Sequence, residues 1–391
     1  MSRTEDLRAL LTVDRAENRG RRILDLLADS TAHELDHALE TVGAIELLAR
    51  VEDRLRGPKL RMELLRLLGK DRLPDLGVAA RAAFVRALQI GRTSTVKEQT
   101  IRDVLLGTHG DDLTALKNVL DTEGGHRDLQ RLVFRDVDDP ALRAEILAHF
   151  RAEARHVTRR ELKILSDVDD TFYANWKDAR FPPKTVYPGV LALYRELDRG
   201  PEIEPGREGD LAFVTARPDD HMGIIERRTL ASLRKRGIGK ATVLSGSFRK
   251  IFGNTSIAEK KLQNFTQYEQ LFPEYDFVFV GDSGQGDVGF GTSLLEQHPD
   301  RVRAVLIHDV VDTPQFVRSE QRRRHVHFFD TYVGAALAAA AERLIEPAGV
   351  ERIARAAMED FAKIRWKSTA QRDARWAELM RDVAAAGIAV T

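Results

Sequence analysis

The sequence contains no cysteine among its 391 residues. Disulfide bonds, thiolate zinc sites, iron–sulfur clusters and cysteine nucleophiles all need that sulfur, so each of them is excluded. A chain of this length can form two or three domains whose cores need no covalent links. Any covalent chemistry of the protein therefore needs a nucleophile other than a thiol.

Long apolar runs and an excess of one charge sign are also missing. The richest apolar segment, residues 333–341, is alanine-dominated and ends at Glu342, short of the roughly 18 to 20 residues of a membrane span. Residues 1–20 carry acids and arginines where a secretory signal needs an apolar stretch, so we expect a cytoplasmic protein. The 61 basic and 61 acidic residues balance, which argues against a protein whose entire surface binds nucleic acid.

Helical patterning fills the N-terminal part, because from about residue 18 to 156 apolar residues recur at three- and four-residue spacings. A repeat at a constant offset of 78 residues matches Ile23, Leu27 and Leu35 to Ile101, Leu105 and Leu113. After a four-residue insertion, Pro58 matches Pro140 and Arg61 matches Arg143. Two copies predict an all-α repeat domain over residues 1–156, which we interpret as a scaffold or a partner-binding surface.

Beyond residue 157 short apolar runs alternate with helical stretches. The runs are 162–165, 211–214, 241–244, 277–280 and 302–307. This alternation predicts a doubly wound parallel α/β sheet over residues 157–330. Residues 331–391 are alanine-rich and helical, and we expect this C-terminal extension to pack on the core. Because ligands of such sheets bind beyond the carboxyl ends of the strands, the residues that follow each run are the candidates for a site.

The segment DVDDT, residues 167–171, follows the first run after one serine. Two carboxylates two residues apart, where a strand opens into a loop, suit a nucleophile and a general acid/base. A calcium loop of the EF-hand type needs glycine at its sixth position, where Phe172 stands. The same DVDD string at 136–139 is followed by Pro140 and predicts a helix N-cap, so the string alone is weak evidence.

Three further segments accompany DVDDT. The second run ends in TARP, residues 215–218, which supplies a hydroxyl and a guanidinium where a phosphoryl oxygen needs donors. Lys260 and Lys261 precede a helix, and the fourth run leads into GDSGQGD, residues 281–287. The two aspartates of this last segment can bring a hard cation to the first aspartate, and its glycines let the backbone come close.

In this order the motifs Asp-x-Asp-x-Thr, Thr, Lys and Gly-Asp-x-x-x-x-Asp resemble the haloacid dehalogenase phosphatase superfamily. The longer strings SDVDDT, FVTARP and VGDSGQGD are similar to the catalytic domain of the actin-patch-protein-type phosphatidate phosphatase family. The similarity covers roughly residues 162–331 and leaves out the helical repeat. It implies Mg²⁺-dependent hydrolysis of a phosphomonoester through an aspartyl-phosphate intermediate.

The resemblance implies a role for each matching residue. Asp167 attacks phosphorus, and Asp169 protonates the leaving alkoxide and then activates the hydrolytic water. Thr215 holds a phosphoryl oxygen, and Lys261 offsets the charge shared by nucleophile and phosphate. This division suits phosphoryl transfer, which depends mainly on positioning and charge neutralisation.

The resemblance also implies a metal site and substrate contacts. Its metal-binding group consists of Asp167, Asp169 through its backbone carbonyl, Asp282 and Asp287. We expect Asp287 to orient water or a neighbouring carboxylate rather than to bind the ion directly. Lys261 is preferred to Lys260 because its spacing to the Phe-Pro pair at 272–273 fits the family better. The candidate substrate contacts are Thr171, Arg217 and Ser283.

Little chain is left for a cap over the site, because 43 residues separate Thr171 from Thr215 and 45 separate Thr215 from Lys261. An open site suits proteins, nucleic-acid ends or lipids at an interface. Residues 217–261 hold eleven basic and four acidic side chains, which fits an anionic membrane surface or an ordinary solvated face. Phosphatidate at a membrane is the leading hypothesis. A phosphatase for protein or nucleic-acid phosphomonoesters, and a phosphate-binding scaffold whose repeat recruits a partner, are the alternatives.

Overall fold

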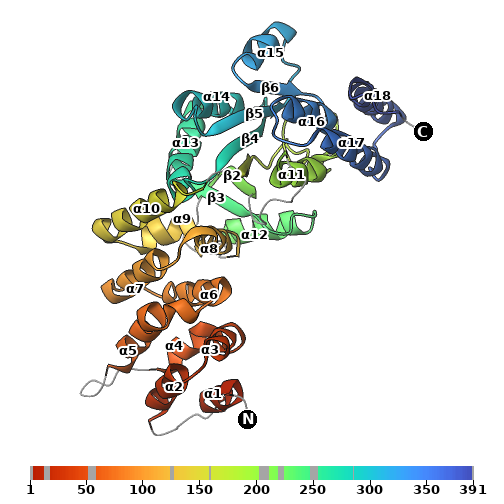
Figure 1. Cartoon of the computed structure of the whole chain (residues 1–391). Coiled ribbons are helices and arrows are strands. Elements are labelled where there is room, and N and C mark those ends of the chain that lie inside the picture. Colours follow the sequence, from red (N-terminus) through yellow and green to blue (C-terminus); the bar gives the residue numbers. More distant parts are fainter. Residues whose placement is uncertain are drawn as a thin grey trace. The chain divides into compact units, whose positions relative to one another are not determined.

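A computed structural model of the whole chain describes residues 3–12, 18–51, 59–123, 127–157, 160–201, 211–218, 224–246, 254–284 and 286–389. The chain divides into two compact units, residues 1–158 with 270–273, and residues 159–269 with 274–391 (Figure 1). The first, helical unit ends at residue 158, against the predicted boundary at 156. The C-terminal segment 331–391 belongs to the second unit, together with the sheet.

The described part of the first unit consists of helices and helical turns joined by short loops. Its α-helices are α1 (Arg3–Thr12), α2 (Arg19–Ala28), α3 (Ala32–Ala38), α4 (Ala44–Arg50), α5 (Leu60–Arg66), α6 (Val78–Leu88), α7 (Thr95–Leu106), α8 (Gly110–Glu123), α9 (Leu129–Arg131) and α10 (Pro140–Ala154). Shorter turns lie at η1 (Leu39–Gly43), η2 (Leu67–Asp71), η3 (Leu73–Asp75) and η5 (Leu132–Asp136). The DVDD copy at 136–139 begins α10, because the Asp139 side chain accepts from the Ala141 amide and Pro140 occupies the first turn. The N-cap interpretation of this copy is therefore confirmed.

Matching positions of the predicted repeat make matching contacts. The Arg61 Nε group donates to the carbonyl oxygen of Val51 at 3.3 Å, and the Arg143 Nε group donates to that of Val133 at 3.0 Å. Both bonds reach back ten residues. All six apolar residues of the first alignment, from Ile23 to Leu113, are buried. These equivalences support the repeat as a structural unit.

A six-stranded parallel sheet forms the centre of the second unit. Its strands are β1 (Leu162–Ser166), β2 (Leu211–Pro218), β3 (Thr242–Gly246), β4 (Asp276–Asp282), β5 (Val302–His308) and β6 (Val326–Phe329). They lie in the order β3-β2-β1-β4-β5-β6. The predicted doubly wound α/β fold is confirmed. The direction of winding reverses between β1 and β4, where folds of this kind bind ligands.

Helices cover both faces of the sheet (Figure 1). The helices of this unit are α11 (Val190–Arg199), α12 (Ile224–Arg234), α13 (Asn254–Leu271), α14 (Asp287–Gln297), α15 (Gln315–Arg322), α16 (Tyr332–Ala341), α17 (Pro347–Ala362) and α18 (Thr369–Ala385). Alternating residues of β4 serve the two faces. Phe277 and Phe279 contact Phe265 of α13 and Phe290 of α14. Val278 and Val280 belong to the hydrophobic core on the opposite face of the sheet, which also includes residues of α11 and α16.

The C-terminal helices pack on this core. Phe361 of α17 contacts Trp366 and Trp376, and Leu379 of α18 is buried in the same cluster. Trp366 also contacts Phe181 in the segment after β1. The extension therefore supports the loop that follows the first strand.

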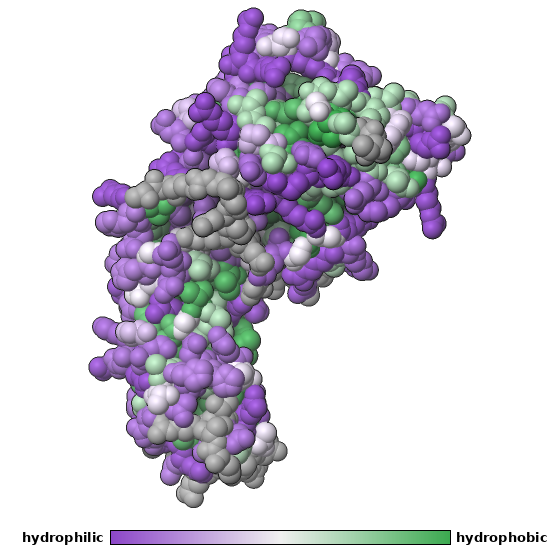
Figure 2. Space-filling view, turned by 45° about the vertical axis from the view of Figure 1, so that its right-hand side comes forward, coloured by the Kyte–Doolittle hydropathy of each residue, from purple (hydrophilic) through white to green (hydrophobic). Residues whose placement is uncertain are grey.

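None of the helices that the structure describes is long and apolar enough to span a bilayer. Hydrophilic residues predominate on the face drawn in Figure 2, and smaller hydrophobic areas lie among them.

Candidate active site

The site begins where β1 and β4 end side by side. Ser166 of β1 pairs with Val280 of β4, and the Asp167 amide donates to the Val280 carbonyl oxygen at 2.9 Å. Asp282 is the last residue of β4. Because the two strands are parallel neighbours, their carboxyl ends bring these two aspartates together at the switch point of the sheet.

A buried lysine joins the two acidic segments. Lys261 Nζ, on α13, donates to Asp167 Oδ1 at 3.0 Å and to Asp287 Oδ1 at 2.6 Å. All three side chains are buried, and Asp287 is the first residue of α14. Lys261 lies inside α13, which corrects the expectation that the two lysines precede a helix. The side chain of Lys260 lies outside the described part of the chain.

Three carboxylates converge beside this lysine. One oxygen each from Asp167, Asp282 and Asp287 lies within 4.8 Å of the other two. Asp282 Oδ1 accepts from the Gly284 amide at 2.6 Å, whereas the buried Asp282 Oδ2 has no hydrogen-bond partner among the described residues. An unpartnered buried carboxylate oxygen is costly unless a cation or a proton meets it.

The charges of the cluster do not balance. Burial, only partly offset by Lys261, raises the pKa of Asp167. Burial and the charges of Asp287 and Asp167 raise the pKa of Asp282. Burial alone would lower the pKa of Lys261, but the two carboxylates hold it above its usual range. Three buried carboxylates around one ammonium group fit a hard divalent cation such as Mg²⁺, which prefers oxygen ligands.

The loop after β1 is held by its own aspartates. Asp170 adopts a left-handed backbone, with φ of 59°, and its carboxylate accepts the backbone amides of residues 175–178. Its carbonyl oxygen lies 2.9 Å from His308 Nδ1. Asp169 Oδ1 accepts from Asn175 Nδ2 at 2.8 Å, and the Asp169 amide donates to Asp167 Oδ2 at 3.1 Å. The loop therefore fixes the second carboxylate relative to the first.

The remaining predicted residues differ in their surroundings. Thr171 is fully buried, and its Oγ1 has no hydrogen-bond partner among the described residues. Ser283 Oγ donates to Asp309 Oδ1 at 2.8 Å and accepts from the Val310 amide at 2.9 Å. The serine hydroxyl thus links the loops after β4 and β5. Thr215 and Arg217 belong to β2, but their side chains lie outside the described part of the chain.

One contributor to the site was missed in the sequence, and a second was a candidate only through its position after the fifth run. The Asn175 side chain donates a hydrogen bond to Asp169. The Asp309 carboxylate accepts hydrogen bonds from the side chains of Ser283, Thr313 and Arg318. Asp309 follows β5 at the same edge of the sheet, so its position was the available signal. Nothing in the sequence around Asn175 distinguishes it from an ordinary loop residue.

Fold and site define an α/β enzyme domain with an acidic cluster at its switch point. Residues 162–309 match the family described as phosphatidate phosphatase APP1, catalytic domain. The resemblance expected from SDVDDT, FVTARP and VGDSGQGD is thereby confirmed for this segment, and it implies a phosphatase. The matched segment begins after the helical unit's residues 1–158. No curated protein and no solved structure matches the chain.

Proposed function

We propose that the protein is a Mg²⁺-dependent phosphomonoesterase of the haloacid dehalogenase type, with Asp167 as its nucleophile and phosphatidate at a membrane surface as its substrate. The observation that carries this proposal is the buried ion pair of Lys261 with Asp167, beside the unpartnered oxygen of Asp282. Phosphoryl transfer to an aspartate requires a carboxylate that is held in place beside a positive side chain and beside a site for a metal cation.

The reaction uses the two aspartates of the β1 loop in turn. An Asp167 oxygen forms a bond to phosphorus while the ester P–O bond breaks, and the alkoxide takes a proton from Asp169. Asp169, held by Asn175, then accepts a proton from water as the water attacks phosphorus and frees Asp167 and phosphate. Lys261 offsets negative charge on Asp167 and on the bound phosphoryl group throughout.

Asp167, Asp282 and the backbone carbonyl of Asp169 would hold Mg²⁺, and Asp287 would be oriented by Lys261. When bound, the cation supplies a Lewis acid that lets an anionic phosphate approach an anionic nucleophile. The oxygen-only donor set and the unpartnered Asp282 Oδ2 support this assignment.

Removal of Mg²⁺ with EDTA is expected to abolish phosphate release from an aryl phosphate. In Asp282→Asn, the Mg²⁺ concentration that gives half the maximal rate is expected to rise at least about tenfold, because an amide is a weaker ligand than a carboxylate. The exposed Asp300 provides a control, since Asp300→Asn removes a charge far from the cluster in the fold. An unchanged Mg²⁺ dependence in Asp282→Asn would overturn the metal assignment.

Three exposed apolar side chains near the site support a lipid interface. Trp176, Val311 and Phe316 are 78%, 51% and 74% exposed, and we call them the apolar rim. Trp176 lies in the loop after β1, and the other two lie after β5, so all three follow strands at the edge that holds Asp167. The bonds of Ser283 to Asp309 and Val310 tie the loops after β4 and β5 together. Exposed aromatic side chains of this kind are typical of proteins that dock at membranes.

Helix α15 adds positive charge to the same surface. It holds no buried residue, and exposed arginines 322–324 lie at its end and just beyond it. Arg323 follows Phe316 by two helical turns and therefore shares its face. Aromatic and basic side chains on one exposed helix face suit an anionic phospholipid surface. The basic stretch 217–261 lies partly outside the described residues.

The double variant Trp176→Ser/Phe316→Ser is expected to lower the rate on phosphatidate in anionic vesicles at least about fivefold, because vesicle binding loses its apolar anchors. Its rate on a soluble aryl phosphate should stay unchanged. Met62→Ser is the control, because Met62 is 49% exposed but belongs to the helical unit. Equal losses on both substrates would contradict a docking role, and so would faster release from a phosphopeptide or a 3′-phosphorylated oligonucleotide than from phosphatidate.

A further inference from the structure

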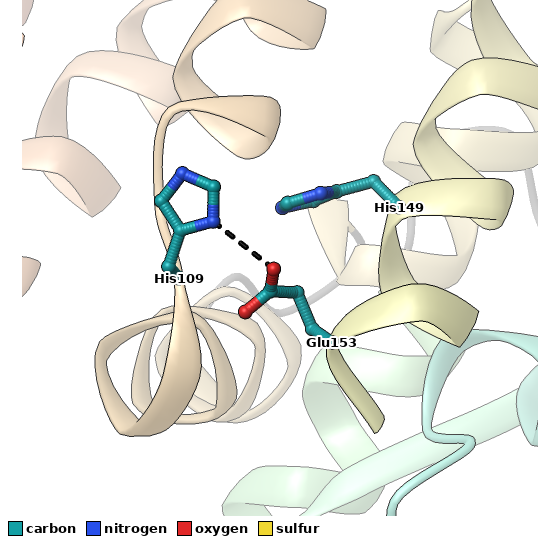
Figure 3. A group of neighbouring side chains, drawn as sticks. All are labelled: His109, His149 and Glu153. Carbon is teal, nitrogen blue, oxygen red and sulfur yellow. Dashed lines mark hydrogen bonds and ion pairs between the residues drawn. The ribbon is translucent and has the colours of Figure 1, made fainter. Parts of the chain in front are cut away.

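We propose that the helical unit binds one Zn²⁺ ion through His109, His149 and Glu153. One ring nitrogen of each histidine and one oxygen of the carboxylate lie within 4.8 Å of one another. Figure 3 shows the two rings and the carboxylate pointing toward a common space. This group belongs to residues 1–158 and is separate from the carboxylate cluster of the sheet.

The helices of the unit bring these side chains together. His149 and Glu153 are four residues apart on α10, so they share one helix face. His109 directly precedes α8, and its Nδ1 lies 3.0 Å from Glu153 Oε1. The two imidazole rings meet edge to face, with centroids 5.2 Å apart. A metal ion at this position would join the start of α8 to the end of α10.

Backbone groups already hold two of the three ligands. The Gly110 amide donates to Glu153 Oε2 at 2.8 Å, and this contact leaves Oε1 directed at His109. His149 Nε2 lies 2.9 Å from the carbonyl oxygen of Thr108, so the ring donates there and its orientation is fixed. Metal ligands are characteristically held by such surrounding hydrogen bonds. The group is therefore arranged before an ion arrives.

The nitrogen and oxygen ligands of this group favour Zn²⁺ over Mg²⁺. Two imidazole nitrogens and one carboxylate oxygen form a set that catalytic zinc sites use, with the fourth position left to water. Mg²⁺ prefers oxygen ligands, so it favours the three-carboxylate cluster instead. The His109 side chain is 65% exposed, which gives an ion access from solvent. The two sites therefore differ in the metal that each prefers.

A second group of the same composition provides an internal comparison. His325, His327 and Glu342 also bring ligand atoms within 4.8 Å. His327 Nε2 lies 2.7 Å from Glu342 Oε1, but its buried Nδ1 has no hydrogen-bond partner among the described residues. A metal ion on Nε2 would require the proton on Nδ1, where it would be buried without an acceptor. The geometry therefore favours the group in the helical unit.

The test uses the full chain with Mg²⁺ in excess, so that the carboxylate cluster does not compete for the probe. Titration with Zn²⁺ in a calorimeter should give one site per chain, and Co²⁺ in its place should give the visible absorption of a low-coordinate nitrogen-ligated ion. His149→Ala and Glu153→Gln should each weaken binding at least about tenfold. His109→Ala should do the same, and its exposed side chain makes it the variant least able to disturb folding, which circular dichroism checks.

His37→Ala and His325→Ala are the matched controls. His37 stacks on His33 one helical turn away, but this pair is not part of any metal-binding group found among the described residues. Neither control should change the Zn²⁺ affinity. The proposal is overturned if Zn²⁺ does not bind, if binding is unchanged in folded His109→Ala, or if only His325→Ala abolishes it.

Discussion

Asp167→Asn is expected to lower kcat for phosphate release by about 10⁴-fold or more. An amide cannot replace the carboxylate as the attacking group, and loss of a covalent nucleophile removes most of the catalysed rate. The substitution keeps the size of the side chain and removes one of three converging negative charges, so the fold should persist. Initial rates with an aryl phosphate and Mg²⁺, together with an unfolding curve for each protein, measure both effects.

The repeated tetrapeptide supplies the control for this variant. Asp136 occupies the place in the helical DVDD that Asp167 occupies in the DVDD after β1. Its carboxylate accepts from Gln89 Nε2 at 2.9 Å and lies 3.5 Å from Arg131. Asp136→Asn should therefore leave kcat unchanged. Comparable activity of Asp167→Asn and wild type would remove Asp167 from the reaction.

Lys261→Met is expected to lower kcat by about 10²- to 10³-fold, because one fixed positive charge at the phosphoryl group is lost. The same change should lower the free energy of unfolding by about 3 to 5 kcal/mol when Mg²⁺ is absent, because it leaves Asp167 and Asp287 buried without their cation. Urea unfolding in EDTA measures the second effect, and rates at saturating Mg²⁺ measure the first.

Lys163 is the matched control for a buried lysine. It lies in β1, fully buried, and its Nζ is 4.6 Å from the centre of the Tyr275 ring. Lys163→Met removes a buried ammonium group outside the carboxylate cluster, so kcat should stay close to that of the wild type whatever the change in stability. A kcat of Lys261→Met as high as that of Lys163→Met would contradict the role of Lys261.

Apolar runs predicted five of the six strands because buried parallel strands are continuously apolar. The observed β2 and β4 extend past their runs to Pro218 and Asp282. At the edge that carries the site, strand residues are polar, so hydropathy alone does not mark the end of the strand. The sixth strand, β6, was missed because it has only four residues, includes His327 and follows a run of arginines.

The acidic part of the site was predictable because parallel strands end at one edge, which places Asp167 and Asp282 together. The choice between Lys260 and Lys261 depended on family spacing, since adjacent helical residues point about 100° apart and only packing decides which one faces inward. The contacts of Asn175 and Ser283 depend on loop conformation. His109 and Glu153 are 44 residues apart, so only the folded helices reveal that they meet.

Detection of a phosphoryl group on the chain is a direct test of Asp167 as the nucleophile. Wild-type protein is mixed with substrate and Mg²⁺, quenched in acid within the first turnover, digested and examined by mass spectrometry. We expect one phosphoryl group, on the peptide that contains Asp167, and none on that peptide in Asp167→Asn. Phosphate release without a phosphorylated peptide, or with the phosphoryl group on another residue, would contradict this role of Asp167.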